Sequence, residues 1–147
     1  QAVILDFSAG TSSGVVVKNT AVGMITIKNL HVKVGNAENH CIMVWRGGNQ
    51  VNVYYNYLEG TGTAADSSGL YALWSPGTTL AMRNYVTLQD IGIMAEGATI
   101  YSNDNAETGT GPVCGLAAYS AGTIGKNGTQ PAGTTRNEDA LRGGEIR

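Results

Sequence analysis

The chain has 147 residues, enough for one domain with a buried core, yet only 14% are charged, well below the roughly one quarter typical of soluble domains. Its net charge of −2 supplies no basic field for phosphate groups, which argues against nucleic-acid binding, and no apolar run approaches the ~20 residues that cross a bilayer. Glycine is abundant, at 21 residues, while lysine and glutamate are scarce, so the composition predicts strands joined by tight turns rather than helices.

Short apolar runs with period-two alternation predict strands along most of the chain. The first lie at residues 2–7 and 15–17, and residues 24–34 follow with a change of phase near Asn29 that indicates a bulge or corner. Further strands are predicted, in chain order, over residues 41–45, 51–58 (one strand or two), 70–74, 80–88, 91–94, 98–101 and 113–119. No stretch has the apolar stripe of an amphipathic helix, and the chain is therefore predicted to be all-β.

Apolar content falls sharply after residue 121, where glycine, threonine, asparagine and charged residues take over. We therefore expect an all-β domain at residues 1–121 and an extended C-terminal arm at residues 122–147. Residues 137–142 have the composition of one short helical turn.

Three segments share an apolar-x-apolar pattern followed by asparagine, at residues 25–29, 51–56 and 80–84. Their starts are 26 and 29 residues apart, within the range of solenoid repeats. The pattern resembles the rungs of right-handed parallel β-helices, as in pectate-lyase-like domains and many phage tailspikes, over roughly residues 24–101. The resemblance implies short strands that fill an interior and asparagines that stack at corners with a left-handed backbone.

Two architectures are compatible with these strands. A β-sandwich or jelly roll also produces self-similar strand-turn-strand units, and we favour it because the repeats are irregular and the chain has room for only a few rungs. A short right-handed parallel β-helix is the alternative.

The Gly/Thr/Asn-rich segment from residue 122 resembles the connecting segments of phage tail-fibre proteins. It lacks the His-rich metal-binding pattern that often follows such a segment, so the resemblance implies no metal site here.

The two cysteines, Cys41 and Cys114, leave two interpretations open. They form one structural disulfide, which would imply an oxidising compartment, or they are two separate buried thiols. Because no second cysteine lies within a few residues of either, a zinc or thioredoxin-type motif is excluded.

No sequence motif indicates catalysis or a cofactor. The chain has no Gly-x-Ser-x-Gly elbow, no phosphate-binding loop and no dinucleotide fingerprint. Its two histidines, His31 and His40, have no third ligand at a metal-binding spacing, and adjacent His40 and Cys41 would point to opposite faces of a strand. We therefore predict no enzymatic activity, no cofactor and no metal.

Tyrosine and tryptophan are concentrated between residues 45 and 85. Their rings combine an apolar face with a polar tip, which suits stacking on sugars or a protein interface. The candidate ligand-binding residues are Arg46, Tyr54, Tyr57 and Trp74.

These features favour a non-enzymatic structural or receptor-binding subunit of a virion or extracellular appendage, such as a phage tail fibre, spike or decoration protein. We expect a homo-oligomer, with a trimer preferred, whose partners are copies of itself and a host surface glycan or other appendage proteins, without nucleic acid or membrane insertion. The alternatives are a carbohydrate-binding module or β-helical polysaccharide-active fragment, and a pilin- or fimbria-like filament subunit.

Overall fold

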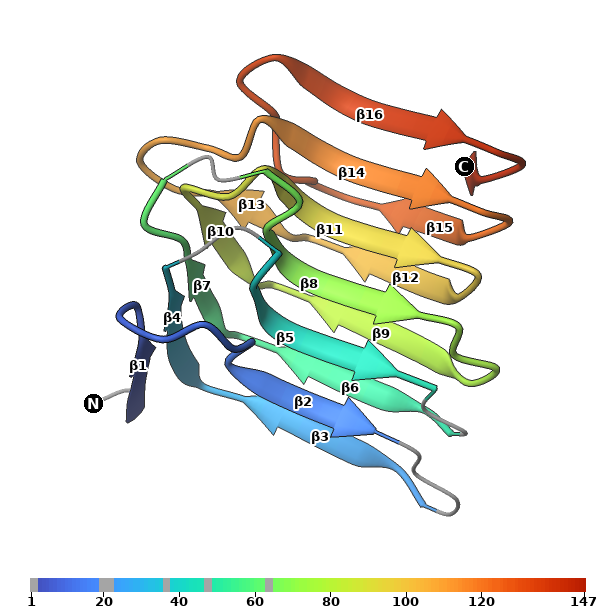
Figure 1. The fold of residues 1–147 in the computed structure, drawn as a ribbon. Coiled ribbons are helices and arrows are strands. Elements are labelled where there is room, and N and C mark those ends of the chain that lie inside the picture. The colour runs from blue at the N-terminus through green and yellow to red at the C-terminus, as the bar shows by residue number, and fades with distance from the viewer. Residues whose placement is uncertain (1–2, 19–22, 36–37, 47–48, 63–64) are drawn as a thin grey trace.

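The computed structural model describes residues 3–18, 23–35, 38–46, 49–62 and 65–147, and every regular element in these ranges is a strand. The strands wind as a parallel β-solenoid of about six turns, in which three sheets enclose one interior (Figure 1). The described residues include no helix of the length and apolarity that a membrane span needs.

Each sheet is built from one strand per turn. Sheet A consists, in spatial order, of β1 (Val3–Phe7), β4 (Leu30–Val34), β7 (Tyr57–Glu59), β10 (Tyr85–Thr87) and β13 (Ala106–Glu107). Sheet B consists of β2 (Val15–Lys18), β5 (His40–Trp45), β8 (Ser68–Leu73), β11 (Ile91–Glu96), β14 (Cys114–Tyr119) and β16 (Arg136–Leu141). Sheet C consists of β3 (Ile25–Lys28), β6 (Val51–Tyr54), β9 (Thr78–Met82), β12 (Thr99–Asn103), β15 (Thr123–Asn127) and β17 (Glu145–Ile146).

The all-β prediction is confirmed, but the preferred sandwich is wrong. Every strand pairing is parallel, and consecutive strands belong to different sheets, as in the pairing of β2 with β5 and of β5 with β8. A sandwich requires antiparallel neighbours. The chain therefore has the architecture of the alternative, a parallel β-helix.

Residues 122–147, expected to form an extended arm, instead complete the last turns of the solenoid. β15 pairs with β12, β16 pairs with β14, and β17 pairs with β15. β16 also replaces the short helical turn expected at residues 137–142. Backbone pairing with the preceding turn holds these polar segments in place, so they need few apolar side chains of their own.

Inward-facing side chains of successive turns stack in register. In sheet B one row runs through Val15, Ile42, Leu70, Ile93 and Leu116, all but the first of them almost completely buried. Because each strand contributes alternate residues to the interior, the short apolar-x-apolar segments are sufficient to fill the core.

Asparagine forms a ladder at the corner between sheets C and A. Asn56, Asn84 and Asn105 are buried one above the other. Asn56 Nδ2 donates to Asn84 Oδ1 at 3.0 Å, and Asn84 Nδ2 donates to Asn105 Oδ1 at 2.9 Å. The side-chain oxygens of Asn84 and Asn105 also accept the backbone N–H groups of Asn56 and Asn84. The stacking implied by the β-helix resemblance is thus present.

The left-handed backbone, however, lies one residue before the ladder. Tyr55, Arg83 and Asp104 have φ values of 50–56° and precede the three ladder asparagines. Asn29, which the sequence pattern aligned with the ladder, has a φ of 59° and so occupies the turn position instead. The side chains that turn the corner point outward, and the following asparagines point inward.

Candidate functional site

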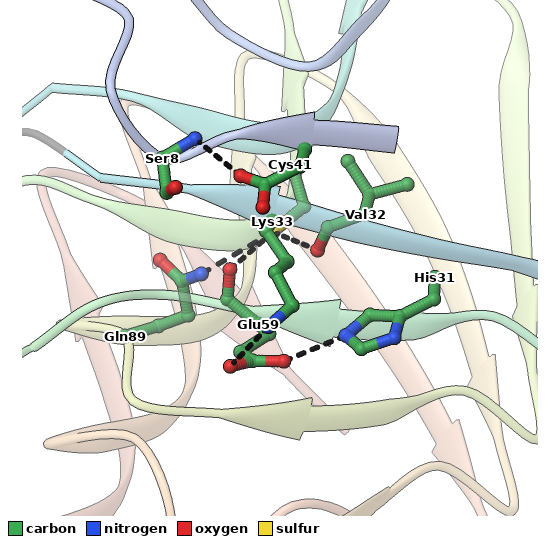
Figure 2. A network of polar contacts seen from close by, with 8 residues as sticks. Ser8, His31, Val32, Lys33, Cys41, Glu59 and Gln89 are labelled. Carbon is green, nitrogen blue, oxygen red and sulfur yellow. Dashed lines mark hydrogen bonds and ion pairs between the residues drawn. The ribbon is translucent and has the colours of Figure 1, made fainter. Parts of the chain in front are cut away.

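A polar ladder crosses the outer face of sheet A (Figure 2). The Glu59 carboxylate on β7 lies 2.6 Å from His31 Nε2 and 3.2 Å from Lys33 Nζ, both on β4. The His31 ring also meets Tyr57 edge-on, with centroids 4.6 Å apart. Because both oxygens of Glu59 are engaged by its neighbours, this ladder is best explained as a contact that fixes the register of β4 against β7.

Beneath this ladder lies Cys41, whose thiol is enclosed by protein. Its Sγ atom is 3.4 Å from the Val32 carbonyl oxygen, 3.5 Å from that of Glu59 and 3.3 Å from Gln89 Nε2 (Figure 2). Burial raises the pKa of the Cys41 thiol well above its usual range. A thiol kept protonated in this way is a poor nucleophile.

The two cysteines are free in the structure. Cys41 lies on β5 and Cys114 on β14, and two strands of sheet B separate them, so they are three strand spacings of about 4.8 Å apart. A disulfide requires Cα atoms within ~7 Å, which this separation does not allow. Of the two interpretations left open by the sequence, the structure has separate buried thiols.

The outer face of sheet B is hollowed. Two adjoining cavities lie along it and have Glu96, on β11, in common. The His40 cavity, of about 280 Å³, is lined by Glu38, His40, Asp66, Tyr71, Met94 and Glu96. The Tyr119 cavity, of about 300 Å³, is lined by Glu96, Tyr119, Ser120, Leu141 and Arg142. We call the two cavities together the sheet B groove.

Glu96 is held at the boundary of the two cavities. The Tyr71 hydroxyl donates to its Oε2 at 2.6 Å, and the Ser120 hydroxyl donates to its Oε1 at 3.3 Å. Burial, together with the bond to Glu96, raises the pKa of Tyr71. Each carboxylate oxygen thus receives a hydrogen bond from a different cavity wall, which fixes the carboxylate between them.

Tyr119 forms the corresponding contact in the next turn. Its hydroxyl donates to the Asp139 carboxylate at 3.0 Å, and Arg136 lies 3.1 Å from the same oxygen of Asp139. Burial, followed by the bond to Asp139, raises the pKa of Tyr119 to about 12. The phenol therefore stays protonated and keeps donating its hydrogen to Asp139 throughout the physiological range.

His40 forms a buried wall of its cavity. Its Nδ1 lies 2.8 Å from Ser68 Oγ, and its ring is 4.5 Å from that of Tyr71. Burial lowers the pKa of His40 to about 4, although the charge of Asp66 opposes this shift. Ser68 is completely buried, so the His40–Ser68 contact does not present an accessible nucleophile.

The depressed pKa of His40 makes the stability of the fold depend on pH. Between its unfolded value of 6.5 and its folded value of about 4, the unfolded chain takes up a proton that the folded chain does not. We expect this residue to cost about 3 kcal/mol of stability as the pH falls from above 6.5 to below 4. Urea unfolding of the wild type and of His40→Asn at several pH values checks this. The asparagine amide can replace Nδ1 as the partner of Ser68, but it does not titrate. The free energy of unfolding should therefore depend less on pH in the variant. Equal pH dependence would contradict it.

The four ligand-binding residues expected from the sequence do not form one site. Arg46 and Trp74 occupy the left-handed corner between sheets B and C, with φ values of 53° and 46°. Tyr54 lies on β6 in sheet C, and Tyr57 lies on β7 in sheet A. Trp74 is half exposed and covers Gly97 of the next turn, where an added Cβ would lie 2.2 Å from the indole ring.

The residues of the sheet B groove were not predicted as a site. In sheet B, Trp45, Leu73, Glu96, Tyr119 and Leu141 occupy one register row. Only an alignment of the turns would have shown this row, since its successive members are 22–28 residues apart in sequence.

In the ranges that the structure describes, no three His, Cys, Asp or Glu side chains are grouped so that they could hold a metal ion. Comparisons with protein family models, with curated proteins and with solved structures found no match to this chain.

Proposed function

We propose that this protein binds an extended glycan along the sheet B groove, without chemically altering it. The observation that carries the proposal is the pair of adjoining cavities that share Glu96 on one face of the solenoid. Sugar sites combine an apolar or aromatic wall with a few fixed polar groups. Here the apolar and aromatic wall consists of Tyr71, Tyr119 and Met94, and the fixed polar groups are those of Glu96 and Ser120.

The arrangement of the cavities suits a polymer better than a single small molecule. The His40 cavity lies over β5, β8 and β11, and the Tyr119 cavity continues over β11, β14 and the end of β16. The cavities therefore follow one another along the direction in which strands repeat every ~4.8 Å. A ligand that repeats chemically can place one unit in each.

Removal of the Tyr119 ring tests this function. Tyr119→Ala is expected to weaken glycan binding by about tenfold or more, in line with the loss of ~1.4 kcal/mol or more from a stacking contact. A glycan array identifies the ligand, and calorimetry then measures the affinity. Tyr101→Ala is the matched control, because Tyr101 is exposed on the outer face of sheet C and should not affect binding. Equal affinity of the two variants, or an array without ligands, would count against the proposal.

We further propose a virion or extracellular surface as the setting for this binding. Low charge and abundant glycine, threonine and asparagine favour this location. A receptor-binding subunit of an appendage would use such a groove to hold surface glycans.

A second candidate function, as a structural subunit that assembles with copies of itself, is favoured by the difference between the solenoid ends. Four exposed aliphatic side chains belong to the first turn or its immediate flank: Val3, Ile4, Val16 and Met24. At the other end, Lys126 and Glu138 form an ion pair in register with the buried Ser102 and Leu116. An apolar end stacked on this charged pair would be unfavourable, so we infer that two copies meet through their first turns.

This assembly predicts a dimer, in contrast to the trimer favoured by the sequence. Multi-angle light scattering should give twice the chain mass, and Val16→Lys on the first turn should shift the protein toward monomer. Leu141→Lys, at an equally exposed position of the last turn, is the control and should leave the dimer intact. A wild-type monomer at high concentration would exclude this role.

A further inference from the structure

One residue with a left-handed backbone follows each of five successive strands of sheet C. These corner residues are Asn29, Tyr55, Arg83, Asp104 and Gly128, with φ values between 50° and 65°. The backbone N–H of each of the first four donates to a carbonyl oxygen of the next turn, as the Asp104 N–H does to Asn127 at 3.1 Å. The Gly128 N–H has no hydrogen-bond partner among the described residues. The series of corner hydrogen bonds therefore leaves one backbone nitrogen unengaged.

Asn127 precedes this nitrogen, and its side-chain amide is held loosely. The side chain is exposed, and its one hydrogen bond within the described ranges is a long contact of 3.4 Å from Nδ2 to Asn103 Oδ1. In the whole sequence, Asn127 is the only asparagine followed by glycine. Glycine has no Cβ to shield its backbone nitrogen. An exposed side-chain amide thus lies next to an unshielded nitrogen.

Asn103 provides a contrast one turn earlier in the same sheet. It is the register partner of Asn127, so the two asparagines occupy equivalent positions. The residue that follows it, Asp104, carries a Cβ, and its N–H is engaged by the Asn127 carbonyl oxygen. The nitrogen that follows Asn103 is therefore both shielded and hydrogen-bonded, whereas the nitrogen that follows Asn127 is neither.

We propose that Asn127 is a site of spontaneous deamidation through a cyclic imide with Gly128. The Gly128 nitrogen forms a bond to Asn127 Cγ, the Cγ–Nδ2 bond breaks, and Nδ2 leaves as ammonia with the proton of the Gly128 N–H. Water then opens the ring. Attack at Cγ gives aspartate, and attack at the former backbone carbonyl carbon gives isoaspartate, in which the chain runs through Cβ. Water is the only co-reactant, nothing is oxidised or reduced, and the reaction does not depend on glycan binding.

The products change this corner in two ways. Both add a negative charge beside Gly128, against which the Asp104 carboxylate lies, and like charges at short distance repel. Isoaspartate also takes out of the chain the carbonyl group that accepts the Asp104 N–H and, at 2.8 Å, Gln130 Nε2. The corner should therefore loosen, and the Asp104 amide should lose protection from hydrogen exchange.

Peptide mass spectrometry of the whole protein, sampled during incubation in mildly alkaline buffer, tests the proposal. Alkaline buffer favours loss of the proton from the attacking N–H. Asn127 should convert about tenfold or more faster than Asn103 and the exposed Asn137. The converted peptide should contain both aspartate and isoaspartate. A rate at Asn127 no higher than at the other two, or aspartate without isoaspartate, would overturn the proposal.

Two variants locate the reaction. Each conversion adds one negative charge to a chain whose net charge is −2, so ion-exchange chromatography separates an acidic form. Asn127→Gln should abolish this form, because the longer side chain must close a larger ring, which is slower. Asn137→Gln is the matched control and should accumulate the acidic form as the wild type does. Thermal unfolding verifies that both variants are folded.

Persistence of the acidic form in Asn127→Gln would assign the reaction to another residue and overturn the proposal. Hydrogen exchange of the separated acidic form then tests the effect on the fold. Loss of protection at the Asp104 amide is the expected result. Unchanged protection there would show that the corner tolerates the product, and the structural consequence inferred for it would be wrong.

Discussion

Replacement of Asn84 by alanine is expected to destabilise the protein by about 4 kcal/mol, near the upper end of single-residue effects. The Asn84 amide accepts hydrogen bonds from the backbone N–H and the Nδ2 of Asn56, both at 3.0 Å. It donates to the Val53 carbonyl at 2.8 Å and to Asn105 Oδ1 at 2.9 Å. Truncation leaves a buried N–H and a buried carbonyl without these partners, at ~1–3 kcal/mol each, and opens a cavity in the middle of the ladder.

Equilibrium unfolding in urea measures this effect. Asn127→Ala is the matched control, since Asn127 is exposed and makes a single long side-chain contact of 3.4 Å to Asn103, so its loss should cost less than ~0.5 kcal/mol. Asn84→Asp offers a second comparison: the carboxylate keeps the size of the side chain but cannot donate to Val53 or Asn105, and it buries a charge. If Asn84→Ala stayed within 1 kcal/mol or so of the wild type, the ladder would not be a main source of stability.

The sequence predicted most strands but not how they pair. Period-two alternation correctly placed strands over β1 to β12 and β14, and the phase change at Asn29 proved to be the corner between β3 and β4. Alternation reports only that one face of a strand is buried. It does not distinguish a parallel partner one turn away from an antiparallel neighbour, so the choice of a sandwich had no local physical basis.

The last turn could not be predicted from apolar content. In β16, Glu138 lies in register with Leu116, so a charged residue takes a position that earlier turns fill with leucine or isoleucine. Backbone pairing to β14 holds this strand in place, and its polar side chains cover the end of the solenoid interior. Terminal turns of solenoids commonly depart from the repeat in this way because they face water on one side.

None of the four candidate ligand-binding residues taken from the sequence lines the sheet B groove. The concentration of tyrosine and tryptophan pointed to aromatic binding surfaces, and Tyr71 belonged to that set, but Arg46 and Trp74 turned out to be corner residues. The groove depends on register across β5 to β16, together with the loops that carry Glu38 and Asp66. These contacts join different turns, so no single segment of sequence contains the signal.

Substitution of Gly115 by alanine is expected to be as severe as loss of the ladder, for a steric reason. A Cβ at this position would lie 2.0 Å from the Pro131 carbonyl oxygen and 2.7 Å from that of Asn137. Both are backbone atoms and cannot rotate aside, so β14 and β16 must separate. Overpacking of this kind costs about 3 kcal/mol or more, and it should act first on the last turn.

Gly62→Ala provides the opposite expectation within the same chain. No atom lies within 4 Å of a Cβ at Gly62, so the added methyl meets no obstacle and should raise stability by ~0.4–1 kcal/mol through the lower entropy of the unfolded chain. Hydrogen exchange should show β16 amides losing protection in Gly115→Ala but not in Gly62→Ala. Because Leu141 and Arg142 come from this turn, the proposed glycan binding should weaken together with that protection. Unchanged β16 protection in Gly115→Ala would show that the backbone relaxes around the methyl group, and the close packing of successive turns would then not depend on glycine here.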